Sequence, residues 1–164
     1  MKPQPSDAAL FNPTFMRAAI ETARIGVNEG DGGPFGACIV KGDNIVAVAH
    51  NTVFQEDATC HAEINAIRFA SKVLDTHDLS GCVIYSTTEP CPMCFAAIHW
   101  ANIERIVYGT NIDDVRRLGF RELSISNHDM RRLGGAHIDI AADFLRQECS
   151  DLLAFWQACK RPVY

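Results

Sequence analysis

Two short segments carry the residue types whose spacing could support chemistry. The first is Cys60-His61-Ala62-Glu63, and the second, further along the chain, is Glu89-Pro90-Cys91-Pro92-Met93-Cys94. One imidazole and two thiolates can hold a zinc ion and leave its fourth position open for water. The sequence therefore predicts a catalytic Zn2+ site whose ligands are His61, Cys91 and Cys94.

Glu63 lies two residues after the histidine and is the candidate acid–base of this site. A carboxylate next to a zinc site can move protons between water and a substrate nitrogen. The pattern H-x-E followed by P-C-x-x-C is typical of zinc enzymes that deaminate nucleobases. The plainer alternatives are a structural zinc or no metal for the three ligands, and a helix N-terminal charge for Glu63.

These segments need helices and strands to position them. Helices are expected from Pro13 to a stop at residues 29–33 and over 61–74, 93–101 and 143–160, with a short helix or turn over 113–118. Strands are expected over 35–40, 45–49, 82–85, 105–108 and 137–141, the first two forming a hairpin. Within 61–74, the helical spacing marks four candidate core positions: Ile64, Ile67, Phe69 and Val73.

This order of elements predicts an α/β fold, a three-layer α/β/α sandwich around a central mixed five-stranded sheet. Both motifs then begin helices that follow loops or strands, where ligands of open α/β sheets bind. We expect residues 1–164 to form a single domain.

Composition and charge indicate a cytoplasmic globular protein. The 164 residues are 48% apolar and suit one domain with a full core. No apolar run reaches the roughly 18 residues of a membrane span, and the loose leader over 1–12 lacks the apolar stretch of a secretory signal. The odd number of cysteines, seven, favours reduced thiols. The net charge of −5 argues against a nucleic-acid partner.

The chain resembles the cytidine and deoxycytidylate deaminase superfamily, and more closely its bacterial guanine deaminase branch. The resemblance rests on the following segments: 33–37, 61–68, 90–94, 97–101, 119–120, 155–158 and Tyr164. It implies a cytidine deaminase-like fold, one zinc ion per subunit, a small-molecule purine substrate, and hydrolytic deamination of guanine to xanthine and ammonia.

The resemblance also implies substrate contacts. Asn51 would hydrogen-bond the purine edge, and Phe35 would pack on the ring. Glu122 would contact substrate and relay protons, although the family is expected to carry aspartate there. Trp100 follows the metal-binding helix and is expected to line the pocket, with plain packing as the alternative.

The C-terminal segment is a further point of resemblance. In bacterial guanine deaminases this segment is exchanged between subunits, and a final tyrosine closes the partner's site. The resemblance thus implies a homodimer in which the segment of about 143–164 is exchanged and Tyr164 acts as the lid. An ordinary frayed terminus is the alternative.

Other functions stay open at this point. The tRNA-adenosine deaminases closely share the segment 89–94, but the basic C-terminal helix expected of them is absent, because acids and bases alternate over 143–161. Guanosine, cytosine and related aminated heterocycles are further candidate substrates. A zinc-stabilised binding module is the non-enzyme alternative.

Overall fold

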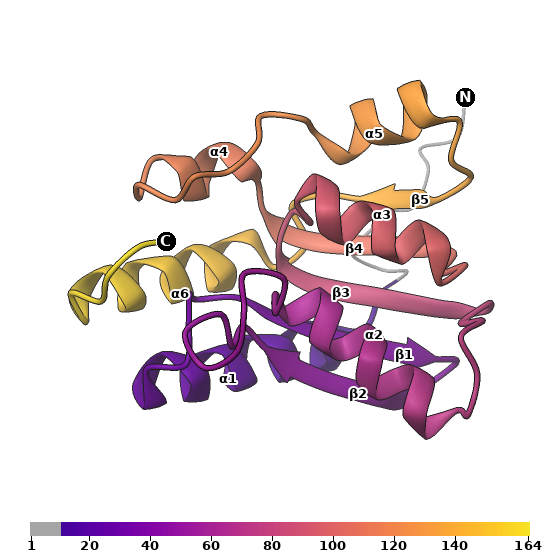
Figure 1. The fold of residues 1–164 in the computed structure, drawn as a ribbon, viewed down its shortest axis with the longest axis horizontal. Coiled ribbons are helices and arrows are strands. Elements are labelled where there is room, and N and C mark those ends of the chain that lie inside the picture. The colour runs from indigo at the N-terminus through magenta and orange to yellow at the C-terminus, as the bar shows by residue number, and fades with distance from the viewer. Residues whose placement is uncertain (1–10) are drawn as a thin grey trace.

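One mixed sheet forms the centre of the molecule (Figure 1). The computed structural model describes residues 11–164, so most of the expected leader over 1–12 lies outside the described residues. Five strands lie in the order β2-β1-β3-β4-β5, with α1 and α6 on one face and α2 and α3 on the other. The predicted three-layer α/β/α fold with its mixed five-stranded sheet is therefore confirmed.

The bounds of the elements follow the predicted order. The strands are β1 (Gly36–Lys41), β2 (Asn44–His50), β3 (Cys82–Thr88), β4 (Arg105–Thr110) and β5 (Asp139–Ala141). The helices are α1 (Pro13–Glu29), α2 (Ala62–Val73), α3 (Pro92–Trp100), α4 (Ile112–Arg116), α5 (Asn127–Gly134) and α6 (Arg146–Ala158). Over residues 11–164, none of these helices combines the length and apolarity needed to cross a bilayer.

Strand direction brings both motifs to one edge of the sheet. β1 pairs antiparallel with β2 and with β3, whereas β3, β4 and β5 run parallel. The carboxyl ends of β2, β3 and β4 therefore meet at the edge where β1 begins. Asn51 follows β2 and Cys91 follows β3 at this edge, which is the usual ligand-binding edge of an open α/β sheet.

Helix α2 does not bury the side chains that its sequence predicts. Phe69 and Val73 are exposed, and the buried positions are instead small or polar: Ala62, Glu63, Asn65, Ala66 and Ala70. Alanines let the helix lie close against the sheet, and the buried polar groups face the site below its first turn. The assignment of Phe69 and Val73 to the core was wrong.

Helix α5 was not predicted, because its residues are mostly polar and Asn127 is the only one that is buried. Its ends are nevertheless marked: Ser126 accepts a hydrogen bond from the Asp129 amide, and Gly135 is left-handed. The last helix begins at Arg146 rather than residue 143, because Asp143 and Leu145 both have positive φ. Left-handed backbone cannot continue a right-handed helix.

Candidate active site

The three predicted metal ligands lie at the first turns of two helices. His61 is the N-cap residue of α2, and Cys91 is that of α3. Cys94 lies one turn into α3, so its sulfur returns to the same point as that of Cys91. His61 Nδ1 is 3.6 Å from the sulfur of Cys91 and 3.6 Å from that of Cys94, and the three ligand atoms lie within 4.8 Å of one another.

These distances fit a tetrahedral zinc ion. A nitrogen at about 2.0–2.1 Å and a sulfur at about 2.3 Å from one zinc, a tetrahedral angle apart, lie about 3.6 Å from each other. The ligand set is also one that zinc prefers, with one imidazole, two thiols and a fourth position free. The residues present therefore fit the metal.

Without bound metal, the two thiols of the site have pKa values shifted in opposite directions. Hydrogen bonding from Cys94, opposed by burial and helped by His61, lowers the pKa of Cys91 to about 4. The bond to Cys91 and burial raise the pKa of Cys94 well above its usual range, and nearby Glu63 adds to this. Two thiolates beside a carboxylate need a cation, because like charges at this distance repel. The site is thus built to receive positive charge.

Glu63 is buried beside the ligands with a defined orientation. Its side chain is only 5% exposed, and its Oε1 accepts a hydrogen bond of 2.9 Å from the Ser86 hydroxyl. Burial raises the pKa of Glu63, while the charge of His61 lowers it. A carboxyl group with a raised pKa beside the metal ligands is suited to accept a proton and to return it.

A cavity opens from these residues to the surface. Its inner end is lined by Phe35, His61, Glu63, Thr88, Glu89, Cys91 and Glu122. Its outer part measures about 270 Å³ and is bordered by Met93, Phe120, Arg121, Leu123 and Tyr164, among others. The ring of Phe35 packs edge-on against Phe120, with centroids 5.2 Å apart. The structure thus brings Phe35 and Glu122 to the cavity that holds the ligands.

Asn51 is fully buried, and its amide has only one available orientation. Its Oδ1 accepts hydrogen bonds of 3.2 Å from the backbone amides of Gly33 and Val53. Its Nδ2 donates a bond of 2.6 Å to the Tyr164 hydroxyl. The oxygen is therefore occupied, and the amide nitrogen faces the hydroxyl of Tyr164, which lines the outer part of the cavity.

Tyr164 closes the mouth of the cavity within its own chain. Its ring packs edge-on against Phe54 and Phe120, at centroid distances of 5.5 and 5.3 Å, and lies 6.4 Å from the His61 ring. Burial raises the pKa of its hydroxyl, so the group stays neutral and able to donate. Upstream, Arg161 donates to the Asn28 carbonyl at the end of α1, which fixes the tail along this path.

Glu122 is the second carboxyl group of the cavity. Burial, followed by the charge of Cys91, raises its pKa to about 7, against a lowering effect of His61. Strongly shifted acids in a cleft are typical of functional sites. Its side chain lines both the inner and the outer cavity, so it is within reach of a bound molecule.

Trp100 is not part of this site. It is the last residue of α3, at the end away from Cys91 and Cys94, and its side chain is 77% exposed. A helix of this length separates its two ends by about 1.5 Å per residue, so the indole cannot reach the cavity of this chain. The expected pocket contact was wrong.

Sequence reasoning missed several residues of the site. Ser86, which holds Glu63, was passed over as strand, although a serine in a buried apolar strand is a signal for a polar partner. The aromatic wall formed by Phe54 and Phe120 was also missed, because it comes from two loops with no periodic pattern. No local signal identifies such a wall.

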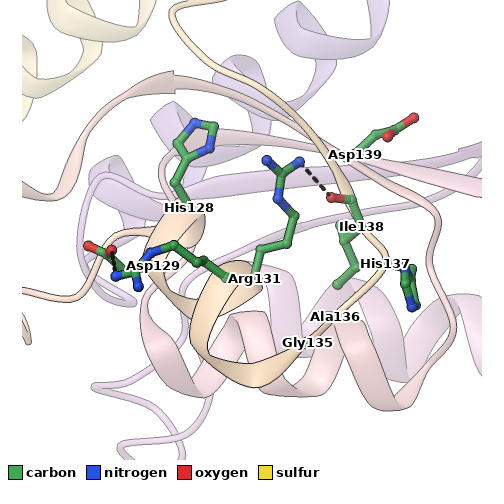
Figure 2. Close-up of a pocket in the computed structure, with 9 residues that line it drawn as sticks. His128, Asp129, Arg131, Gly135, Ala136, His137, Ile138 and Asp139 are labelled. Carbon is green, nitrogen blue, oxygen red and sulfur yellow. Dashed lines mark hydrogen bonds and ion pairs between the residues drawn. The ribbon is translucent and has the colours of Figure 1, made fainter.

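A larger hollow lies elsewhere in the described residues. It measures about 690 Å³ between α5 and the segment leading into β5. Figure 2 shows Arg131 reaching across it to donate a hydrogen bond to the Ile138 carbonyl, and Asp129 forms an ion pair with Arg132. None of the predicted site residues lines it, so size alone does not mark the functional site.

Comparisons with known proteins agree with this geometry. Residues 11–110 match the family model for the cytidine and deoxycytidylate deaminase zinc-binding region. The guanine deaminase of Bacillus subtilis is 46% identical over 108 residues, covering 65% of this chain and 69% of that protein. A tRNA-specific adenosine deaminase of Buchnera aphidicola is 33% identical over 150 residues, covering 91% of this chain and 90% of its own. Among solved structures, a guanine deaminase from Nitrosomonas europaea superposes with a TM-score of 0.80 at 31% identity, over 96% of this chain and 88% of that one.

Proposed function

Because this chain belongs to the cytidine and deoxycytidylate deaminase family, we propose that it hydrolyses guanine to xanthine and ammonia. Hydrolytic deamination is the chemistry of the family. The choice of base is the proposed part, since guanine deaminases and tRNA-adenosine deaminases are both similar to this chain.

The ligand set and Glu63 divide the chemistry between them. His61, Cys91 and Cys94 would hold one zinc ion per subunit, which when bound supplies a Lewis acid that brings the pKa of water to about 7. Glu63 takes one proton from the water and passes it to a ring nitrogen of the substrate. It then takes the remaining proton of the hydroxyl group added to the ring carbon and passes it to the amine, so that a carbonyl forms and ammonia leaves. Ser86 holds Glu63 in the orientation for both transfers.

The position of Tyr164 is the observation that carries the choice of a free base. Its ring stands over the metal ligands and closes a cavity of about 270 Å³, which is below the range of about 300–1,000 Å³ for pockets of drug-sized ligands. A ribose or a polynucleotide must displace this ring to reach Glu63. A planar base without a sugar need not.

The polar groups of the cavity favour an oxopurine. Asn51 presents its amide nitrogen, because its oxygen is occupied by two backbone amides. The Tyr164 hydroxyl accepts from Asn51 and keeps its own proton to donate. Two donors pair with a carbonyl oxygen or an unprotonated ring nitrogen and not with an exocyclic amine. Guanine carries a carbonyl where adenine carries an amine.

Guanosine, cytosine and tRNA adenosine remain the alternative substrates, and the net charge of −5 gives a polynucleotide little electrostatic attraction. The homodimer and the exchange of about 143–164 stay predictions. The tail reaches the cavity of its own chain here, so a closed site does not require exchange.

A substrate panel tests the proposal directly. Zinc-loaded protein is incubated with guanine, guanosine, adenine, cytosine and a tRNA, and ammonia is followed. We expect turnover of guanine and none of the tRNA. Turnover of the tRNA with inert guanine would reject guanine as substrate, and no ammonia from any of them would favour a zinc-stabilised binding module.

A further inference from the structure

Three further polar residues outside the cavity form a hydrogen-bonded set next to Asn51. We propose that Thr22, His50 and Asp31 are positioning residues that fix the Asn51 amide with its nitrogen toward the substrate. By doing so they set the preference for a purine that presents a carbonyl over one that presents an amine at the same place. The inference rests on the proposed function, because it concerns the same site.

A chain of hydrogen bonds links the three residues. His50 Nε2 lies 2.9 Å from Asp31 Oδ2, and His50 Nδ1 lies 3.3 Å from the Thr22 hydroxyl. A carboxylate only accepts hydrogen bonds, so Nε2 carries a proton and donates a hydrogen bond to Asp31, while Nδ1 shares a hydrogen bond with the Thr22 hydroxyl. The imidazole is thereby held at both nitrogens between α1 and the loop over 30–33.

The backbone is shaped around this arrangement. A Cβ added at Gly26 of α1 would lie 2.4 Å from His50 Cδ2, and one added at Gly32 would lie 2.0 Å from Asn51 Oδ1. Neither distance is possible in a protein, so both glycines are required for the histidine and the asparagine to occupy their places. His50 and Asn51 are neighbours in the chain, as are Asp31 and Gly32.

Two side-chain contacts therefore connect the loop over 30–33 with residues 50–51. One tie joins His50 to Asp31, and the other joins Asn51 Oδ1 to the Gly33 amide. The Asp31 carbonyl also accepts from the Phe54 amide, which holds the ring under Tyr164. If the bond between His50 and Asp31 is lost, the loop over 30–33 is held less firmly and the Gly33 donor can withdraw. The Val53 amide is then the one backbone donor left on Asn51 Oδ1, so the Asn51 amide turns more readily.

The arrangement acts only through Asn51. Thr22, His50 and Asp31 do not line either part of the cavity. They can act on a bound purine only through Asn51, whose amide nitrogen bonds to the Tyr164 hydroxyl at the outer part of the cavity. A turned amide presents an acceptor, which pairs with an exocyclic amine. The effect of breaking the tie is thus a change of preference between two purines, and a simple loss of folded protein would lower the turnover of both equally.

Two substitutions of His50 separate the two bonds. In His50→Gln the side-chain amide nitrogen reaches the place of Nε2 and keeps the bond to Asp31, whereas in His50→Asn it reaches only the place of Nδ1. The measured quantity is kcat/KM for guanine divided by kcat/KM for 2,6-diaminopurine, with zinc-loaded protein. We expect a fall of about tenfold or more in His50→Asn and in Asp31→Ala, equivalent to about 1.4 kcal/mol or more, and little change in His50→Gln.

Control variants and a binding measurement separate a positioning effect from a general loss of activity. His77→Asn alters an exposed histidine in the loop after α2 and is expected to leave the ratio unchanged. Should His50→Asn fail to fold, Asp31→Ala removes the same bond and should lower the ratio alone, whereas Thr22→Val loses only the bond that His50→Gln also lacks and should change it little. The affinities of zinc-loaded protein for 8-azaguanine and 2,6-diaminopurine, measured by calorimetry, report the same preference without turnover.

The outcomes distinguish this inference from the proposed function. Wild-type protein that does not deaminate guanine rejects the proposed function, and the affinity ratio still tests the positioning role. An unchanged ratio in His50→Asn and Asp31→Ala, or equal effects of His50→Gln and His50→Asn, overturns the positioning role even when wild type is a guanine deaminase.

Discussion

Replacing Ser86 by alanine tests the acid–base role of Glu63 without touching the cavity wall. The Ser86 hydroxyl donates to Glu63 Oε1 at 2.9 Å, and both side chains are buried. Ser86 lines neither part of the cavity and is not among the zinc ligands. The substitution therefore removes one hydrogen bond to the carboxylate and leaves substrate contacts and metal ligands unchanged.

The size of the effect follows from the nature of the bond. A hydrogen bond to a charged group contributes about 1.5–3 kcal/mol, and more is lost when the remaining partner is buried. If the bond holds Glu63 in its reactive orientation, the loss falls on the transition state and lowers kcat by roughly 10- to 150-fold. KM should change little, because ground-state contacts are untouched.

Steady-state ammonia release at saturating guanine measures this effect, with zinc content determined on the same samples. Ser124→Ala, at an exposed serine, is the matched control and should keep the wild-type kcat. A Ser86→Ala protein with full zinc content and unchanged kcat would refute the assignment of Glu63 as the proton carrier held by Ser86.

Further predictions concern other residues of the site. Glu63→Gln should retain zinc and lose turnover, and persistent activity in a zinc-containing variant would contradict its role. Cys91→Ser should lower zinc content and the melting temperature together, since ligand removal breaks the site; full zinc occupancy by metal analysis would argue against the ligand assignment. Tyr164→Phe removes the bond to Asn51 and the donor that the hydroxyl offers to substrate, and should raise KM for guanine by about 2- to 10-fold, while Tyr164→Ala should also admit guanosine; identical kinetics would end the lid proposal. Burial raises the pKa of Glu122 from 4.5 to about 7, so this group binds its proton more tightly in the folded state. The free energy of unfolding of zinc-free protein should therefore fall as pH rises from about 4.5 to 7. Denaturant unfolding of Glu122→Gln should show a weaker dependence on pH, and the same dependence as wild type would contradict the raised pKa.

The sequence predicted the parts of the site that depend on local spacing. His61, Cys91 and Cys94 converge because each lies in the first turn of a helix at one sheet edge, which the order of elements already predicts. What depends on tertiary packing could not be predicted. The orientation of the Asn51 amide is set by Gly33 and Val53 through the loop geometry, which leaves no local pattern.

Helices with a weak apolar face were the least predictable elements. α5 buries only Asn127, so hydrophobic periodicity has nothing to detect, and its existence depends on its caps. Trp100 shows the converse error, because a large aromatic beside a motif suggests a pocket wall while the helix direction carries it away. Residue spacing predicts which side of a helix a residue lies on. It does not predict which end of the helix lies near the ligand.

The two ligand-bearing helices share an unusual start. Neither His61 nor Cys91 makes a side-chain capping hydrogen bond to its own helix, because both side chains are turned to the common point between them. The amide protons at residues 62–64 and 93–94 thus depend on what occupies that point. When a chelator removes the metal, hydrogen–deuterium exchange should accelerate by a similar factor at the first turns of α2 and α3. The two helix starts, although far apart in the chain, should then fray and reform together.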